Sequence, residues 1–153
     1  MKKMIRSMLA VVVSLGLGSV AMGSPKQARA CDSETAASAP IITHREAKDS
    51  LGALLRSRGL AQPTASEVVV RNYELDGDPN TAEALVDVIA VELCVGGCTT
   101  IVVRETSSGL VAMGHGKFLV PASSKSCGWS DLIESALPFL TARVLRFVNG
   151  SYE

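Results

Sequence analysis

VELCVGGCTTIVVRETSSGLVAMGHG, residues 91–116, contains two turns and the strand-like run between them. The first turn is Val-Gly-Gly and the second is Ser-Ser-Gly, and residue clusters of this kind separate strands. The β-branched run Thr99–Thr106 is therefore predicted to pair backwards across the first turn and, across the second, with Leu110–Val120. Two further β-type runs, Val68–Leu75 and Leu85–Val95, precede the stretch. The sequence thus predicts a four-stranded antiparallel meander.

We expect a helix on either side of this meander. Upstream, Thr43 and Glu46 have the spacing of a capping box, which marks a helix N-terminus, and Gly59 is placed to end the helix. Downstream, a second helix is predicted to begin near Asp131, where Asp131 and Glu134 have the spacing of a helix cap and its returning carboxylate. Apolar residues continue from there at helical spacing as far as Val148.

The run that ends at Val120 also indicates how a helix packs. Ala112, Gly114 and Gly116 alternate along it and would share one face. A face of small side chains lets a helix backbone approach closely, so a helix is placed over it. The predicted fold class is α+β: a single domain with a four-stranded, mainly antiparallel sheet and an N-terminal and a C-terminal helix packed on one face.

The N-terminus has the anatomy of a secretory signal. Residues 1–23 combine a basic start, an apolar run and an Ala-Met-Gly cleavage site. The apolar run is shorter than the ~20 residues of a membrane-spanning helix. We expect residues 1–23 to be a signal peptide, residues 24–41 a flexible leader and residues 42–150 the exported domain. The mature protein would be periplasmic or secreted, with no stable membrane span.

The charge of the mature chain excludes one class of partner. Loss of Lys2, Lys3 and Arg6 with the signal peptide leaves 12 basic against 15 acidic residues, a net charge of −3. A weakly acidic chain without a basic cluster lacks the electrostatic footprint that binds a phosphate backbone. We therefore expect no nucleic-acid partner.

The four cysteines predict disulfides, which are the default in an exported chain. Cys94 and Cys98 flank a glycine turn between strands, where a bridge can form. Their three intervening residues differ from the two that paired zinc ligands usually have and from the two of a thioredoxin-type redox pair. A structural Cys94–Cys98 bridge is favoured over free or differently paired thiols and over a redox or metal pair. Cys31 and Cys127 would form a second bridge, tying the leader to the loop before the final helix.

Other groups that could carry chemistry are interpreted as structural. Gly114-His115-Gly116-Lys117 is not a phosphate loop, because such a loop needs a helix directly after it and this run lies in a predicted strand. His115 is expected to be an exposed histidine on that strand. The segment Asp76–Asn80 is an Asx turn that lacks the glycine and the closing glutamate of a calcium loop. Asp87, Glu92 and Glu105 lie on predicted strands and are expected to face solvent. No catalytic, cofactor-binding or metal-ligating residue is assigned.

The stretch RETSSGLVAMGHG, Arg104–Gly116, resembles a hairpin of bacterial envelope accessory domains of the CsgG-like (curli-secretion) and LpoB type. In those domains a strand ends in a polar-Thr-x-Gly turn and returns with a valine and a glycine. The resemblance extends over roughly residues 43–148, through the order of helix, strands and closing helix. Glu105 stands where aspartate is usual, and the Cys94/Cys98 tip and the missing lipidated cysteine also depart from the pattern. The resemblance implies an exported α/β module that binds another envelope component. No catalytic residue carries over, because those domains are not enzymes.

We therefore expect an exported, non-enzymatic binding or assembly module of the cell envelope or extracellular space. It would act through protein–protein contact, with another envelope or secreted protein as its partner and no cofactor. Two alternatives stay open. A small exported thiol-redox protein or enzyme would use Cys94/Cys98 or His115, and it predicts a reducible bridge or a perturbed histidine titration. A secreted inhibitor would use a binding loop held by the Cys94–Cys98 bridge.

Overall fold

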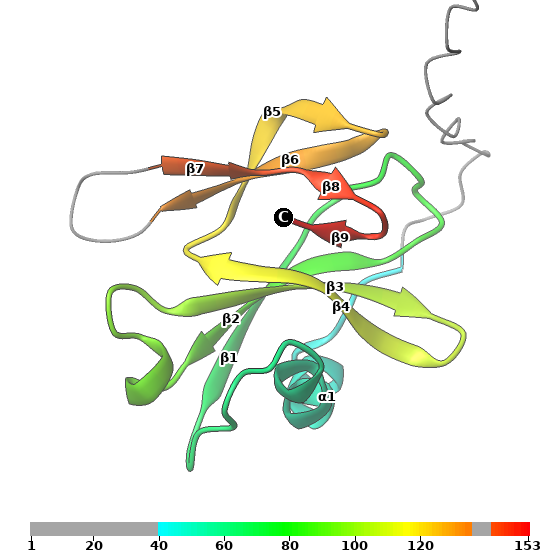
Figure 1. The fold of residues 1–153 in the computed structure, drawn as a ribbon. Coiled ribbons are helices and arrows are strands. Elements are labelled where there is room, and N and C mark those ends of the chain that lie inside the picture. Colours follow the sequence, from blue (N-terminus) through cyan, green and yellow to red (C-terminus); the bar gives the residue numbers. More distant parts are fainter. Residues whose placement is uncertain (1–39, 136–141) are drawn as a thin grey trace, which may run out of the picture.

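A computed structural model describes residues 40–135 and 142–153 of the chain. The strands of this part form three antiparallel sheets, in the orders β1-β2-β3-β4, β5-β6-β7 and β8-β9. Figure 1 shows α1 against one side of the four-stranded sheet and the two smaller sheets on its other side. The elements are α1 (His44–Ser57), β1 (Glu67–Asn72), β2 (Glu83–Ile89), the short 3-10 helix η1 (Val91–Leu93), β3 (Thr99–Thr106), β4 (Gly109–Lys117), β5 (Val120–Ser126), β6 (Trp129–Ser135), β7 (Ala142–Leu145), β8 (Phe147–Val148) and β9 (Ser151–Tyr152).

Helix α1 begins and ends as the sequence predicts. Thr43 Oγ1 accepts a hydrogen bond from the Glu46 amide at 3.2 Å, and the Glu46 carboxylate accepts one from the Thr43 amide at 2.8 Å. Together these bonds form the capping box. Gly59 follows the helix with a φ of 68°, and the Leu60 amide donates to the Leu55 carbonyl at 2.9 Å. This left-handed glycine with its backward hydrogen bond ends the helix.

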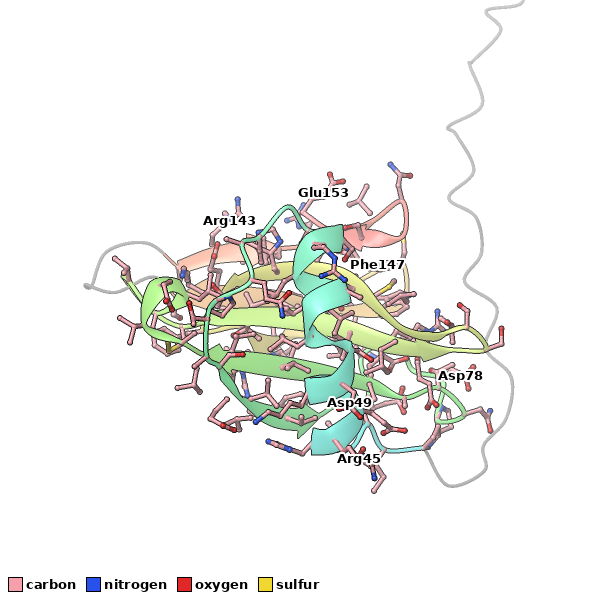
Figure 2. All side chains as sticks on the ribbon, turned by 90° about the horizontal axis from the view of Figure 1, so that it is seen from below. Arg45, Asp49, Asp78, Arg143, Phe147 and Glu153 are labelled. Carbon is pink, nitrogen blue, oxygen red and sulfur yellow. A yellow bond between two sulfur atoms is a disulfide. The ribbon has the colours of Figure 1, made fainter. Side chains whose placement is uncertain are left out.

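The four-stranded meander is confirmed, and it separates two hydrophobic cores. Neighbouring side chains of a strand point to opposite faces, so β2 and β3 contribute to both cores. Val86 and Ile101 are fully buried in the core that includes the inner face of α1. Leu85 and Val102 are fully buried in the core formed with the smaller sheets. Figure 2 shows α1 lying across the strands, with the exposed Arg45 in its first turn.

The predicted C-terminal helix is wrong. The segment from Asp131 onwards forms strands, β6 and β7, and residues 136–141 lie outside the described part of the chain. The Asp131 carboxylate does not cap a helix but accepts a hydrogen bond from the Ser124 hydroxyl of β5 at 2.6 Å. Leu132 and Leu145 face each other across β6 and β7, and both are buried in the second core. Tertiary packing overrides the helical spacing here, so the fold is mostly β with one α-helix in the described residues, in place of the predicted α+β domain.

The small residues of β4 do not share one face, which corrects a second expectation. The register of β3 against β4 shifts where Val102 pairs with Gly114 and Val103 with Ala112, which leaves Met113 of β4 as the extra residue. As a result Ala112 packs with the α1 core, whereas Gly114 lies against Tyr152 of β9. A Cβ added at Gly114 would lie 2.7 Å from the Tyr152 Cβ. This glycine therefore makes room for a strand, not for a helix.

Candidate functional site

Cys94 and Cys98 form the predicted disulfide. The β2–β3 connection that contains the bridge is longer than the predicted three-residue turn, because β2 ends early and η1, Val91–Leu93, comes before Cys94. Inside the bridge the Gly97 amide donates to the Cys94 carbonyl at 3.0 Å. We call residues 90–98, which connect β2 and β3, the disulfide loop.

The base of the disulfide loop is bonded to the sheet. The Leu93 carbonyl accepts hydrogen bonds from Lys117 Nζ at 2.7 Å and from Thr99 Oγ1 at 3.1 Å. Gly97 packs closely against the Phe118 ring, which a Cβ at this position would approach to 2.6 Å. The loop is thus held both by its own cross-link and by the end of β4.

The tip of the disulfide loop presents apolar side chains to solvent. Val91 is 86% exposed and Val95 77% exposed, and Ile89 at the end of β2 is 45% exposed. Single exposed apolar residues are ordinary on a protein surface. The two valines together are a more specific feature, because Val95 lies inside the turn closed by the bridge and Val91 lies in η1 just before it.

The second predicted bridge stays a prediction. Cys127 lies in the turn between β5 and β6, is exposed and is bonded to no other described cysteine. Cys31, its predicted partner, lies outside the described residues.

His115 lies exposed on β4, as predicted. Partial burial and then the charge of Arg58 lower the pKa of its imidazole. Glu134 is the carboxylate whose charge acts on it most, but both Glu134 oxygens are engaged. One accepts a hydrogen bond from the Lys117 amide at 2.7 Å, and the other pairs with Arg143 at 3.2 Å. Among the described residues, the carboxylate that acts most on His115 is thus already bonded at both of its oxygens.

Of the three carboxylates predicted to face solvent from strands, two are exposed and one is not. Glu92 and Glu105 are exposed, although Glu92 lies in the 3-10 helix η1 and not on the predicted strand. Asp87 is not exposed, and the prediction for it is wrong: it accepts two hydrogen bonds of 2.8 Å from Arg71 and one of 2.6 Å from the Thr100 hydroxyl. This cross-strand pairing explains Asp87 as a structural residue.

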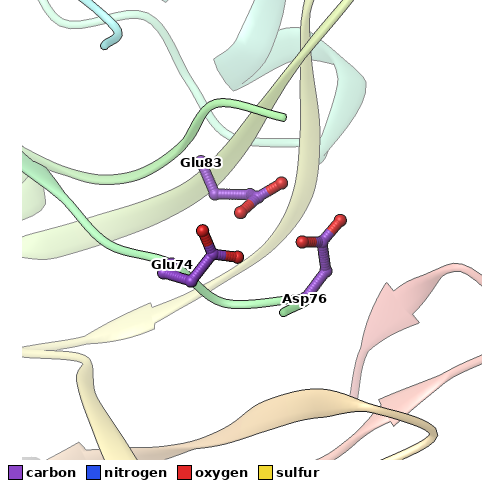
Figure 3. A group of neighbouring side chains, drawn as sticks. All are labelled: Glu74, Asp76 and Glu83. Carbon is purple, nitrogen blue, oxygen red and sulfur yellow. The ribbon is translucent and has the colours of Figure 1, made fainter. Parts of the chain in front are cut away.

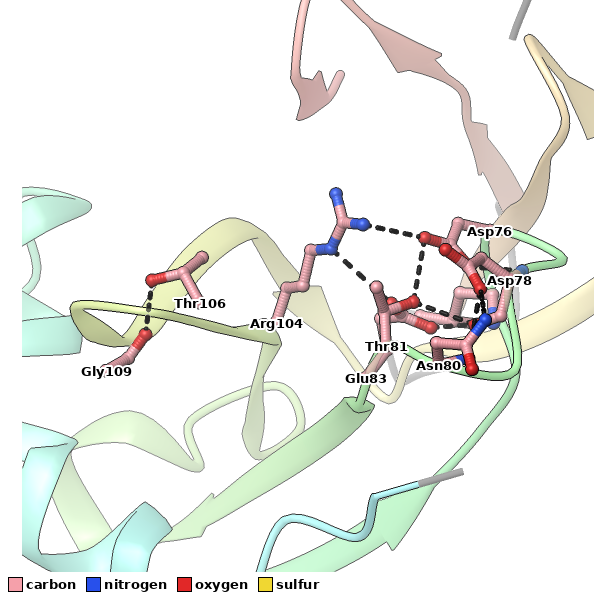
Figure 4. Close-up of polar contacts among 9 residues, drawn as sticks. Asp76, Asp78, Asn80, Thr81, Glu83, Arg104, Thr106 and Gly109 are labelled. Atoms are coloured by element: carbon pink, nitrogen blue, oxygen red, sulfur yellow. Dashed lines mark hydrogen bonds and ion pairs between the residues drawn. The ribbon is translucent and has the colours of Figure 1, made fainter. Parts of the chain in front are cut away.

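A further group of carboxylates lies where the β1–β2 connection meets β2. Glu74 and Asp76 come from the connection and Glu83 is the first residue of β2, and one oxygen of each lies within 4.8 Å of the others (Figure 3). We call these three residues the carboxylate cluster. Arg104, paired with Glu83 in the β2–β3 register, provides the positive charge. It lies 3.0 Å from Asp76 Oδ2 and 3.6 Å from Glu83 Oε1 (Figure 4).

The turn that carries Asp76 is stabilised by its own side chains. Asp76 Oδ1 accepts a hydrogen bond from the Asp78 amide at 2.7 Å, and Asp78 Oδ1 accepts one from the Asn80 amide at 2.9 Å. Thr81 Oγ1 lies 3.0 Å from Asp76 Oδ2 and 2.9 Å from the Asp78 carbonyl, and its hydroxyl also acts on Glu83, whose pKa it lowers. The segment is the Asx turn predicted from the sequence.

The carboxylate cluster is hydrogen-bonded to the smaller sheets. Glu83 Oε2 accepts from the Leu75 amide at 3.3 Å, and the Leu75 carbonyl accepts from the Ser130 amide of β6 at 2.6 Å. The Ser130 carbonyl in turn accepts from the Tyr152 hydroxyl of β9 at 2.8 Å. We call this chain of contacts from Glu83 to Tyr152 the sheet junction.

Burial and charge shift the protonation of the carboxylate cluster. Burial raises the pKa of Glu83 to about 7, and the Asp76 charge adds to the rise, while hydrogen bonds and the Arg104 charge partly offset it. The pKa of Glu74 is raised as well, first by burial and then by the Asp76 charge. Burial of its carboxyl thus places the proton exchange of Glu83 near neutral pH.

An open cleft of about 260 Å³ lies beside the cluster. Glu74 and Glu83 line it together with Asn72, Tyr73 and Ile41. Its volume is below the roughly 300–1,000 Å³ of ordinary small-molecule sites. The cleft opens to solvent beside Glu74, which is exposed, whereas the Glu83 side chain is buried.

Comparisons with protein-family models, with curated proteins and with solved structures found no match for this chain. The resemblance to CsgG-like and LpoB-type domains accordingly stays a prediction. No helix in the described part of the chain is both long and apolar enough to cross a bilayer.

Sequence reasoning did not single out Glu74, Glu83 or Arg104. The signal that could have found two of them is an ionisable residue at the end of each of two apolar strands, Glu83 before Ala-Leu-Val and Arg104 after Ile-Val-Val. Opposite charges at paired positions of antiparallel strands attract. Using that signal requires the strand register, which the sequence does not give.

Proposed function

We propose that the protein is an exported, non-enzymatic binding module that contacts another envelope or secreted protein through the disulfide loop. The observation that carries this proposal is the exposure of Val95, at 77%, within the turn closed by the Cys94–Cys98 bridge, together with that of Val91, at 86%, in η1 just before the bridge. Apolar side chains gain free energy when a partner removes them from water. A loop that is ordered before binding loses little conformational entropy in the complex.

The anchoring of the loop supports the same role. The Lys117 ammonium and the Phe118 ring hold the base of the loop against the end of β4, so the loop is fixed to the four-stranded sheet. The N-terminal residues 1–23, with the pattern of a secretory signal, support export. The secreted-inhibitor alternative would use the same surface and differs only in having an enzyme as the partner.

The proposal is tested by site-directed photocrosslinking of the full chain in its native host. A photoreactive amino acid at Glu92, the exposed position between Val91 and Leu93, reports contacts of the loop tip. The matched control carries the same group at Arg45, whose side chain is 91% exposed on α1. We expect a crosslinked species of defined mass from position 92 and none from position 45.

A second variant separates contact from folding. Val91→Ser combined with Val95→Ser keeps the disulfide and removes the apolar surface, so it should lower the crosslink yield from position 92 at least several-fold. Thermal melting of the variant should match the parent, because both valines are exposed. Equal crosslinks from positions 92 and 45, or none from either, would show that the disulfide loop is not the contact surface.

A further inference from the structure

One oxygen of Glu83 has no hydrogen-bond donor. The side chain is 0% exposed, and no donor of the described residues bonds Oε1. The closest cationic atom, Arg104 Nε, is 3.6 Å away, beyond hydrogen-bond range. The other oxygen, Oε2, is occupied by the Leu75 amide. A buried ionised oxygen without a donor is costly, whereas a protonated one becomes a donor itself.

The neighbours of Glu83 provide acceptors for such a proton. Glu74 and Asp76 face it from the β1–β2 connection, Arg104 from β3 and Tyr152 from β9. Only one of these groups is positively charged. The phenol of Tyr152 stays neutral, because burial and then the Glu83 charge raise its pKa. With every carboxylate ionised, the cluster would carry three negative charges against one guanidinium.

We propose that protonation of the Glu83 carboxyl stabilises the sheet junction and that loss of this proton loosens it. With its proton, Glu83 donates from Oε1 to a neighbouring carboxylate of the cluster while Oε2 continues to accept from the Leu75 amide. Without the proton, repulsion among the three carboxylates pushes the β1–β2 connection outward and weakens the Leu75–Ser130 contact that joins the four-stranded sheet to β6. The proton comes from solvent through the cleft beside Glu74.

The pH range of this switch lies around neutrality. Burial and the Asp76 charge raise the pKa of Glu83 to about 7, so the carboxyl is mostly protonated at pH 6 and mostly ionised at pH 8. The inference does not depend on the binding role of the disulfide loop, because the loop and the junction share no residue.

The test is a titration of the folded, exported chain followed at the two amides of the junction. In ¹⁵N-resolved NMR spectra between pH 5 and pH 9, the Leu75 and Ser130 amides should shift with a common midpoint near 7. Trp129, the one tryptophan of the chain, should show the same midpoint in its fluorescence, because the Arg104 side chain lies over its ring. Hydrogen-exchange protection of both amides, corrected for the intrinsic rate, should fall roughly tenfold from pH 6 to pH 8.

Two variants identify the group that titrates. Glu83→Gln keeps an acceptor for Leu75 and supplies a permanent donor, so it should remove the midpoint and keep both amides protected at pH 8. Glu105→Gln, an exposed position on the same strand as Arg104, should leave the titration unchanged. The proposal is overturned if the wild-type Leu75 amide titrates below pH 5.5, or if the wild-type midpoint persists in Glu83→Gln. If Glu83→Gln does not fold, the midpoint of the Leu75 amide in the wild type tests the proposal by itself: a value near 7 supports it and a value below pH 5.5 overturns it.

Discussion

The Arg104 guanidinium lies over the Trp129 ring, 5.2 Å from its centroid, while it bonds Asp76 at 3.0 Å. A side chain of β3 therefore contacts both the carboxylate cluster and the aromatic part of the second core. Trp129 also stacks on Phe147 of β8 with ring centroids 4.0 Å apart. A guanidinium over an aromatic face is attracted by the ring electrons, most strongly where water is excluded. The acidic cluster and the aromatic core thus share one residue.

Replacing Arg104 with alanine should lower the free energy of unfolding by roughly 3 kcal/mol, since buried carboxylates lose their counter-charge. Lysine at the same position should lose less, because it keeps the charge but not the planar stacking on Trp129. Urea unfolding followed by tryptophan fluorescence measures both. Arg45→Ala, an exposed position, is the control and should change stability by less than about 0.5 kcal/mol. A loss below about 1 kcal/mol for Arg104→Ala would contradict the importance of this contact.

Stability should depend on pH through Glu83. Its pKa is about 7 in the folded chain, above the ordinary 4.5, so the folded state binds the proton more tightly than the unfolded state does. The stabilisation from this proton is complete below pH 4.5 and is lost as the pH rises through 7. Urea midpoints of the wild type should therefore fall between pH 6 and pH 8, and those of Glu83→Gln should fall much less. An equal fall in both proteins would exclude Glu83 as the cause.

Gly114→Ala should destabilise the protein by about 2 kcal/mol, because the added methyl overpacks a rigid contact. Its Cβ would lie 2.7 Å from the Tyr152 Cβ and 3.5 Å from the Tyr152 Cα, so relief requires movement of β9 itself. Gly52→Ala in α1 is the matched control. There the new methyl meets only the flexible Gln62 side chain, at 3.0 Å, and alanine favours the helix by up to about 1 kcal/mol. Thermal melts in which Gly114→Ala is as stable as Gly52→Ala would contradict the close packing of β4 and β9.

The parts of the fold that the sequence predicts are those with local signals. The capping box of Thr43 and Glu46 and the glycine after α1 mark the two ends of one helix, close to it in sequence. The four meander strands follow each other through turns. The C-terminal strands lack such a signal. Asp131 and Glu134 imitate a helix start, and the pairing of Leu132 with Leu145 that decides the matter joins two separate segments. Pairing over that distance is a tertiary property that propensity does not report.

The same difference between local and distant signals separates the two candidate sites. The Cys94–Cys98 bridge follows from the spacing of two cysteines around glycines, and the sequence predicts it correctly. The carboxylate cluster does not follow, because Arg104 meets Asp76 across 28 positions of the chain. That meeting depends on the β2–β3 register and on the fold of the Asx turn.

The assignment of Cys94–Cys98 as a bridge that holds a contact loop, and not a reactive dithiol, is tested most directly by intact mass. The chain is expressed with an export signal, alkylated with and without a mild reductant, and weighed. Peptide mapping then assigns each label to its cysteine. We expect no label at Cys94 or Cys98 until a strong reductant is added. Labelling of both cysteines under mild reduction would contradict the assignment and favour the thiol-redox alternative.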